Sequence, residues 1–201
     1  MKTIIIISTS ILALFFTACN SSGSKQTPPD SVIRAGNNAD SATLRSETKN
    51  SPAIAANVKP ADGILTGYLN LKNSLAADNG SDAAKNGQEI LNALSKFDVS
   101  TLTPDQKRVF LGLVGDIKEN SQHINENGDK IAHQREHFEM LSIDMYDLAK
   151  SVGTDKTLYL DSCPMYDDGK ATWLSEMKEI KNPYLGKKMD TCGALKETIR
   201  N

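Results

Sequence analysis

Residues 129–153 read DKIAHQREHFEMLSIDMYDLAKSVG, and the pattern of this stretch predicts a helix. Its apolar side chains recur with the period of an α-helix, at Ile131, Phe138, Leu141, Met145 and Leu148. Gly153 follows the last apolar turn, where a glycine commonly ends a helix. We therefore expect one helix over residues 129–152, with its apolar stripe directed into a core.

Two amphipathic helices are predicted at the start of the folded part. The first begins near Pro60, and its apolar positions are Ile64, Leu65, Tyr68, Leu69, Leu71 and Leu75. Gly80 is the expected end of this helix, and Ser81 is the expected N-cap of the next. The second helix carries its apolar stripe at Ala84, Ile90, Leu91, Leu94 and Phe97.

A third helix opens at Thr103 and Pro104, which suit an N-cap and a first helical turn. Its inward positions are Val109, Phe110, Leu113, Val114 and Ile117. The polar residues 120–128 form either a loop or a solvated helical turn, and His123 within them is not expected to have a role. Four helices joined by short breaks favour an antiparallel up-and-down bundle.

The periodicity changes after Gly153. Residues 157–163 alternate as a short strand does, and residues 171–174 form the returning strand after the turn sequence Asp167-Asp168-Gly169. A lone hairpin is marginal in water, so it must pack on the bundle, with Trp173 buried there. A last short helix is expected from Lys187 to about Arg200. The predicted fold class is therefore mainly α: a bundle of about four helices with a small C-terminal β-hairpin and a short terminal helix.

The N-terminus has the features of an export signal. Lys2 precedes the apolar run 3–16, which is too short to span a bilayer. The run ends in Phe16-Thr-Ala-Cys19, which resembles the lipobox of bacterial lipoproteins, apart from Phe16 at a position that is usually aliphatic. An ordinary signal peptide is the alternative, and either one takes the protein out of the cytoplasm.

The chain is thus expected to have three parts. Residues 1–18 are a lipoprotein signal peptide, and residues 19–58 are a disordered tether that starts at an acylated Cys19. The tether carries too few apolar side chains to order itself, and a coil of this length reaches roughly 35 Å. Residues 59–201 form the helical domain. The expected location is the cell envelope, facing the periplasm and anchored to a membrane through Cys19.

Composition and motifs exclude several functions. A net charge of −2 argues against a nucleic-acid partner. Nucleotide-binding and hydrolase motifs do not occur. Cys163 and His137 could serve as a nucleophile and a base, but the local signature of a thiol enzyme does not accompany them. We therefore predict that the protein is not an enzyme.

Sulfur-containing residues are concentrated near the C-terminus. In a strand Cys163 and Met165 share a face, and in a helix Met189 and Cys192 share a face, so the two pairs can converge if the chain folds back. Thiolates and thioethers together select Cu(I) over hard cations. In the helix upstream, His133, His137 and Met140 lie along one face, whereas Met145 falls on the apolar stripe and is expected in the core.

A disulfide is the competing interpretation of the two cysteines. Outside the cytoplasm a lone pair of cysteines is first expected to be oxidised. A Cys163–Cys192 bridge would close a loop of about 30 residues and contribute roughly 3 kcal/mol. The protein would then be a structural or protein-interaction lipoprotein without a metal.

Three motifs carry a resemblance to a known family. They are His133-Gln-Arg-Glu-His137-Phe138, Cys163-Pro-Met165 and Asn182-Pro-Tyr184-x-Gly186-x-x-Met189-x-x-Cys192-Gly193. Together they resemble a domain of unknown function from periplasmic lipoproteins, mainly of the Bacteroidetes. A similar domain is appended to the C-terminus of some periplasmic adaptor subunits of copper and silver efflux systems. Leu185 and Tyr166 depart from the usual Phe and Ala without removing a candidate ligand.

This resemblance implies a metal-binding role and, as possible partners, heavy-metal efflux components. The predicted function is binding of a soft metal ion, Cu(I), as a periplasmic sink, carrier or efflux accessory. The predicted ligands are Cys163, Met165, Met189, Cys192 and His137, of which His137 carries the least weight.

Overall fold

A computed structural model describes residues 59–200 of the 201-residue chain. The predicted leader 1–18, the predicted acylation site Cys19 and the predicted tether 19–58 all lie outside the described residues. The described elements are α1 (Asp62–Ala76), α2 (Gly80–Ser95), α3 (Pro104–Glu126), α4 (Ile131–Val152), β1 (Leu158–Ser162), β2 (Thr172–Ser175) and β3 (Ala194–Ile199), with short 3-10 helices η1 (Val99–Thr101), η2 (Asp167–Gly169) and η3 (Gly186–Lys188).

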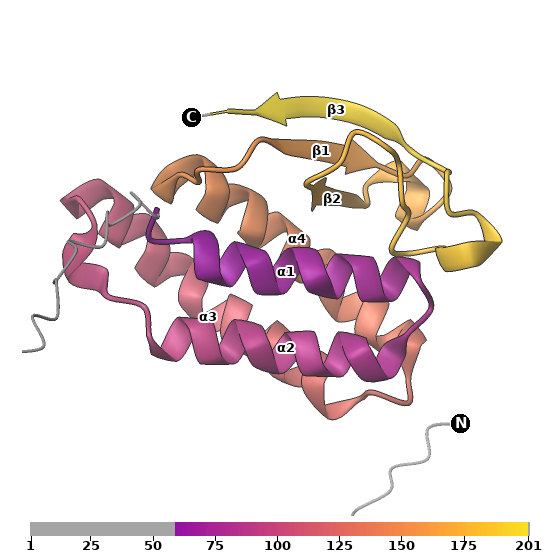
Figure 1. The fold of residues 1–201 in the computed structure, drawn as a ribbon, viewed down its shortest axis with the longest axis horizontal. Coiled ribbons are helices and arrows are strands. Elements are labelled where there is room, and N and C mark those ends of the chain that lie inside the picture. Colours follow the sequence, from indigo (N-terminus) through magenta and orange to yellow (C-terminus); the bar gives the residue numbers. More distant parts are fainter. Residues whose placement is uncertain (1–58, 201) are drawn as a thin grey trace, which may run out of the picture. The chain divides into compact units, whose positions relative to one another are not determined.

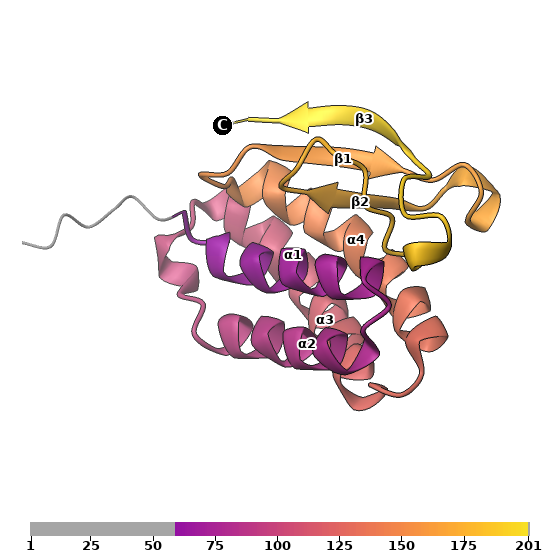
Figure 2. The same cartoon turned by 45° about the vertical axis from the view of Figure 1, so that its right-hand side comes forward.

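The four helices form a bundle in which each packs against the next in sequence, and α1 also contacts α4 (Figure 1). The β-sheet lies over α1 and α4, so α2 and α3 form the far side of the domain (Figures 1 and 2). The predicted mainly α fold, with a helical bundle and a C-terminal β region, is confirmed. Within the described residues, the helices lack the combination of length and apolarity that crossing a bilayer requires.

Local sequence explains most of the helix ends. Thr103 and Gln106 form the reciprocal capping box that starts α3, with bonds of 3.0 and 3.3 Å between each side chain and the other's backbone N–H. The predicted ends around Gly80 were wrong, because Asn79 caps α2 and Gly80 is its first residue. A Cβ on Gly80 would lie 2.6 Å from the carbonyl oxygen of Gly128, so close packing of two turns requires a glycine there.

Helix α3 runs through most of the polar stretch 120–128, which was predicted as either a loop or a solvated helical turn, so the helical alternative is confirmed as far as Glu126. Asn120, Ser121 and Ile124 are buried, and α3 ends only at Glu126. Ile124 is seven residues after the buried Ile117 and therefore lies on the same helix face. The extension places His123 on a helix.

The C-terminal sheet has three strands in the order β2-β1-β3, all antiparallel. The hairpin of β1 and β2 is confirmed, with Asp161 opposite Trp173. The predicted short terminal helix was wrong: residues 194–199 form β3 on the other edge of β1. Pairing with an open strand edge outweighs the weak helical pattern of this segment.

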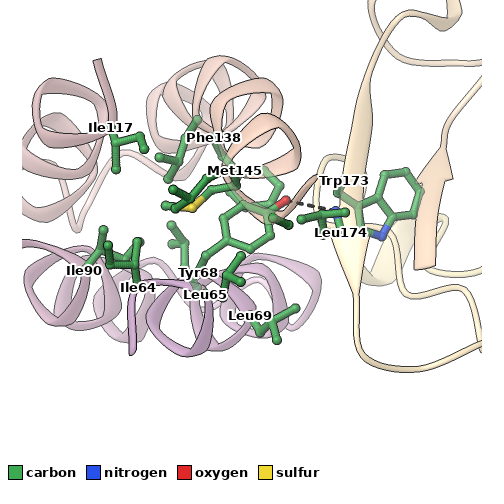
Figure 3. Close-up of a cluster of buried hydrophobic side chains, with 14 of the residues drawn as sticks. Ile64, Leu65, Tyr68, Leu69, Ile90, Ile117, Phe138, Met145, Trp173 and Leu174 are labelled. Atoms are coloured by element: carbon green, nitrogen blue, oxygen red, sulfur yellow. Dashed lines mark hydrogen bonds between the residues drawn. The ribbon is translucent and has the colours of Figure 1, made fainter. Parts of the chain in front are cut away.

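Tyr68 joins the bundle to the sheet (Figure 3). Its hydroxyl oxygen accepts the backbone N–H of Leu174 at 3.1 Å and lies 2.8 Å from the Ser142 hydroxyl. Its ring stacks on Phe138 with the ring centroids 5.2 Å apart. Trp173 and Met145 are fully buried, as predicted. One core therefore spans the helices and β2.

Charged groups are buried where α1 meets the sheet. Lys72 is fully buried, and its Nζ lies 3.3 Å from the Ser175 hydroxyl oxygen and 3.1 Å from a carboxylate oxygen of Glu176. Asp161 is also fully buried, and its carboxylate oxygens have no hydrogen-bond donor among the described residues. Burial raises the pKa of Asp161 to about 7, although the positive charge of Lys72 acts in the opposite direction.

Candidate functional site

The two cysteines of the folded domain form a thiol pair, with 3.5 Å between the sulfur atoms of Cys163 and Cys192. Neither is in a disulfide. Cys163 follows β1 directly and Cys192 precedes β3. Because Ser162 pairs with Ala194 across these two strands, the cysteines are brought together by the sheet register.

A buried asparagine holds the Cys192 side of the pair. The amide nitrogen of Asn182 donates to the carbonyl oxygen of Cys192 at 2.7 Å. Its amide oxygen accepts the N–H groups of Tyr184 and Leu185 at 2.8 and 2.9 Å. One side chain thus fixes both the Asn-Pro-Tyr turn and the segment that carries Cys192, which explains why an asparagine stands at this position.

The thiols differ in their surroundings. Cys163 is fully buried, whereas Cys192 is half-buried. The hydrogen bond with the Cys163 thiol, and then burial, raise the pKa of the Cys192 thiol above its ordinary value. Without a bound cation the raised pKa therefore favours the protonated thiol form of Cys192.

The two predicted methionine ligands differ in how exposed they are and in how they are linked to the cysteines. The carbonyl oxygen of Met189 accepts the N–H of Cys192 at 3.1 Å, in a turn after η3 rather than in the predicted helix. Met189 is half-buried. Strand β1 ends at Ser162, so Cys163 and Met165 do not share a strand face, and Met165 is 66% exposed.

His137 belongs to a second group, which we call the histidine cluster: His123, His133 and His137. One ring nitrogen from each lies within 4.8 Å of the others. The His123 and His137 rings are stacked, with centroids 4.3 Å apart and planes 3° from parallel, and His133 stands edge-on to His137 at 4.6 Å. Each of the three side chains is partly exposed.

Buried contacts hold the two helices of this cluster in register. The amide nitrogen of Gln134 donates to the carbonyl oxygens of Ile124 and Gly80, both at 3.0 Å. Gln134 is adjacent to His133 and Ile124 is adjacent to His123, so this bond fixes the helix turns that carry both histidines. Gln134 is fully buried, which shields the bond from water.

Two of the imidazoles have an oriented ring. The Nδ1 atom of His137 lies 3.0 Å from the amide oxygen of Asn120, and the Nδ1 atom of His133 lies 3.0 Å from a carboxylate oxygen of Glu136. Both oxygens are acceptors, so Nδ1 is the donor nitrogen, and in the neutral form of each ring Nε2 keeps its lone pair. Burial, followed by the charges of His123 and His133, lowers the pKa of His137, which favours its neutral form.

A hollow of about 440 Å³ opens beside His137. Its lining residues come from α3 and α4: Asp116, Glu119, Asn120, His137, Met140, Ile143 and Asp144. Burial, and then the carboxylates of Asp116 and Asp147, raise the pKa of Asp144 to about 6. The hollow therefore presents carboxylates and one thioether to whatever approaches the cluster.

Sequence reasoning missed His123. It placed this residue in a polar stretch without a role, because charged and amide side chains hid the helical period. The signal was present in the seven-residue spacing of Ile117 and Ile124, which continues the apolar stripe of α3. His133 and His137 were placed together correctly on one helix.

The described residues form a helical-bundle domain with a C-terminal β-sheet. Residues 64–157 match the family model described as Protein of unknown function (DUF3347). The match covers α1 to α4 and all three histidines, and it ends before β1 and the cysteines. Searches among curated proteins and among solved structures found no match. The resemblance to efflux adaptors stays a prediction.

Proposed function

We propose that this protein is an exported lipoprotein that binds a soft metal ion, Cu(I), as a periplasmic sink, carrier or efflux accessory. The observation that carries the proposal is the 3.5 Å separation of the Cys163 and Cys192 sulfur atoms. Two sulfur ligands at about 2.3 Å from one tetrahedral ion lie roughly 3.8 Å apart. The thiol pair therefore needs only a small adjustment to hold an ion.

Thiolate charge and softness favour Cu(I) at this pair. Binding converts two thiols and one Cu(I) ion into a bis-thiolate complex and releases two protons. Burial of Cys163 excludes water, so the cation supplies the charge compensation that the thiolates need. Met189, which is half-buried and joined to Cys192 by a turn, is a better candidate for a thioether ligand than the exposed Met165.

The competing function is a disulfide staple without a metal. The same separation of the sulfur atoms also favours a disulfide, because two thiols that lie close together in an oxidising compartment readily form a bridge. The residues are 29 apart in sequence, so the bridge would stabilise the domain by about 3 kcal/mol. Oxidation and metal binding use the same sulfur atoms and exclude each other.

Anaerobic titration separates the two functions. The fully reduced chain is titrated with Cu(I) against a chromogenic Cu(I) chelator. We expect one ion per chain, with affinity lowered at least 100-fold by Cys163→Ser or Cys192→Ser. Met177→Leu, which removes a sulfur outside the proposed site, is the matched control and should bind as the parent does. His137→Gln in the same series measures the predicted contribution of that residue.

The result that contradicts the Cu(I) proposal is equal binding by the parent and by the double Cys163→Ser, Cys192→Ser variant. In that case the disulfide interpretation stands. Export is tested separately: mass spectrometry of the membrane fraction should find an acylated peptide that begins at Cys19. A soluble product cleaved elsewhere would exclude the anchor.

A further inference from the structure

The chain contains three histidines, and all three meet in the histidine cluster. They come from two helices, His123 from α3 and His133 and His137 from α4. Partly exposed histidines on a surface have no general physical reason to lie close together, because neighbouring imidazoles repel each other once they are protonated. Their convergence is the observation from which this inference starts.

We propose that His123, His133 and His137 form a second metal site, separate from the thiol pair, for a borderline divalent transition-metal ion of the Zn²⁺ or Cu²⁺ kind. Imidazole nitrogen is a preferred ligand of these ions, and no thiolate is present to select Cu(I). The site shares no sulfur ligand with the proposed Cu(I) site, and His137, which was predicted as a Cu(I) ligand, lies with His123 and His133 in the histidine cluster.

The distances suit an ion after a small closure of the cluster. Nitrogen ligands at about 2.05 Å from a tetrahedral ion lie roughly 3.4 Å apart. One ring nitrogen from each histidine already lies within 4.8 Å of one from each of the other two. Because each side chain is partly exposed, rotation about its own side-chain bonds can supply the remaining movement.

Two ligands are already oriented by a partner on the opposite ring nitrogen. Asn120 and Glu136 each hold an Nδ1 atom at 3.0 Å, which leaves Nε2 of His137 and His133 as the coordinating atom. A metal-bound histidine commonly has such an oxygen partner, which fixes the tautomer and the ring plane. The Gln134–Ile124 bond then fixes the distance between the two helices.

Three protein ligands leave the fourth position of a tetrahedral ion for water or another small ligand. The hollow beside His137 provides access to it. Asp116, Glu119 and Asp144 line this hollow, and their carboxylates favour the approach of a cation over that of an anion. An ion here would exchange more easily than one enclosed at the buried thiol pair.

Cobalt titration tests the site without interference from sulfur. The probe is Co²⁺, added to the full chain carrying Cys163→Ser and Cys192→Ser. We expect saturation at one ion per chain, with a visible absorption spectrum typical of tetrahedral nitrogen coordination. Competition by Zn²⁺ and by Cu²⁺, each added alone, then shows which ion binds more tightly.

Single variants assign the ligands. His123→Gln, His133→Gln and His137→Gln should each lower Co²⁺ affinity at least tenfold. The matched control is Gln122→Ala, an exposed neighbour whose side-chain amide donates to Glu126, and it should bind within twofold of the parent. A melting curve for each variant checks that the domain is folded. We expect each variant to fold, because the histidines are partly exposed.

A positioning role for Asn120 has its own readout. Asn120→Ala removes the acceptor of the His137 Nδ1 proton and should lower affinity by about 10- to 100-fold. Long-range ¹H–¹⁵N spectra of the parent should show Zn²⁺ on Nε2 of His133 and His137, and in Asn120→Ala the His137 tautomer should become mixed. Absence of saturable Co²⁺ binding by the parent, or equal binding by the three histidine variants, would overturn the proposal.

Discussion

The thiol pair and the histidine cluster are built by different means. Strand pairing joins Cys163 to Cys192, which are 29 residues apart, in a mostly buried place. Helix packing joins His123 to His133, ten residues apart, in a partly exposed place. The two groups use different residue types and different structural layers of one domain.

One small domain thus contains two groups of side chains that would suit different metal ions. Buried thiols exclude water and favour a soft ion that is released slowly. Exposed imidazoles keep a coordination position open and favour exchange. A matching contrast appears in the family match, which includes the histidines but stops before the cysteines. The helical half and the sheet half can therefore be tested against each other.

The largest expected effect comes from cutting the chain where the family match ends. A fragment of residues 59–157 should lose cooperative thermal unfolding, because removal of β2 exposes Tyr68 and leaves Lys72 without Ser175 and Glu176. Circular dichroism melts measure this. The control is a fragment of residues 59–201, which should melt within a few degrees of the full mature chain. A cooperative melt by the shorter fragment would show that the helices are independent of the sheet.

A smaller effect should follow from Tyr68→Phe, which removes the hydroxyl between the two halves. The N–H of Leu174 would be left buried without its acceptor, at a cost of about 1–3 kcal/mol. Denaturant unfolding gives the free energy. Ser142→Ala, which removes the hydroxyl partner of Tyr68 together with its bond to the Phe138 carbonyl oxygen but leaves the Leu174 N–H paired, should cost less. A neutral Tyr68→Phe would mean that this hydrogen bond does not hold the sheet on the bundle.

The buried charge of the sheet half should respond to pH. The pKa of Asp161 is raised from 3.8 to about 7 in the folded protein. The protonated carboxyl is therefore the stabilising form: its contribution is complete below pH 3.8 and is lost as the pH rises through 7. Asp161→Asn should raise the melting temperature at pH 8 and change it little at pH 5. An equal change at both pH values would contradict the assigned cause.

The smallest effects should come from the two methionines near the thiol pair. Met165→Leu alters an exposed side chain and should leave Cu(I) affinity within twofold of the parent. Met189→Leu should lower the affinity by more than that, because Met189 is joined to Cys192 by a turn. Both changes nearly conserve volume and should cost under about 1.5 kcal/mol of stability. A larger loss of affinity in Met165→Leu would support the prediction that Met165 is a ligand together with Cys163.

Sequence reasoning succeeded where the cause is local. The helices follow from apolar periodicity. Thr103 begins α3 and Gly153 ends α4, each in a conformation that the residue itself favours. Reasoning failed where another segment decides. β3 forms because β1 offers an open edge, and position 80 requires a glycine because Gly128 packs against it.

The candidate sites show the same division. The i, i+4 spacing of His133 and His137 placed them together, but His123 joins them only through the packing of α3 on α4. The proximity of Cys163 and Cys192 was predicted from a chain that folds back, whereas the actual cause is the register of β1 with β3. A local sequence pattern predicts neither the third histidine of the cluster nor the register between β1 and β3.

The hydrogen bond between Tyr68 and Leu174 joins residues 106 apart, and this has a consequence for the order of folding. Contacts between successive helices close short loops and form quickly, whereas contacts between distant segments form slowly. We expect the bundle to form first and the sheet to dock last. Both thiols would then be accessible during folding and become enclosed in the final step. Pulse alkylation during refolding should label Cys163 until that step, and early protection of Cys163 would reverse the order.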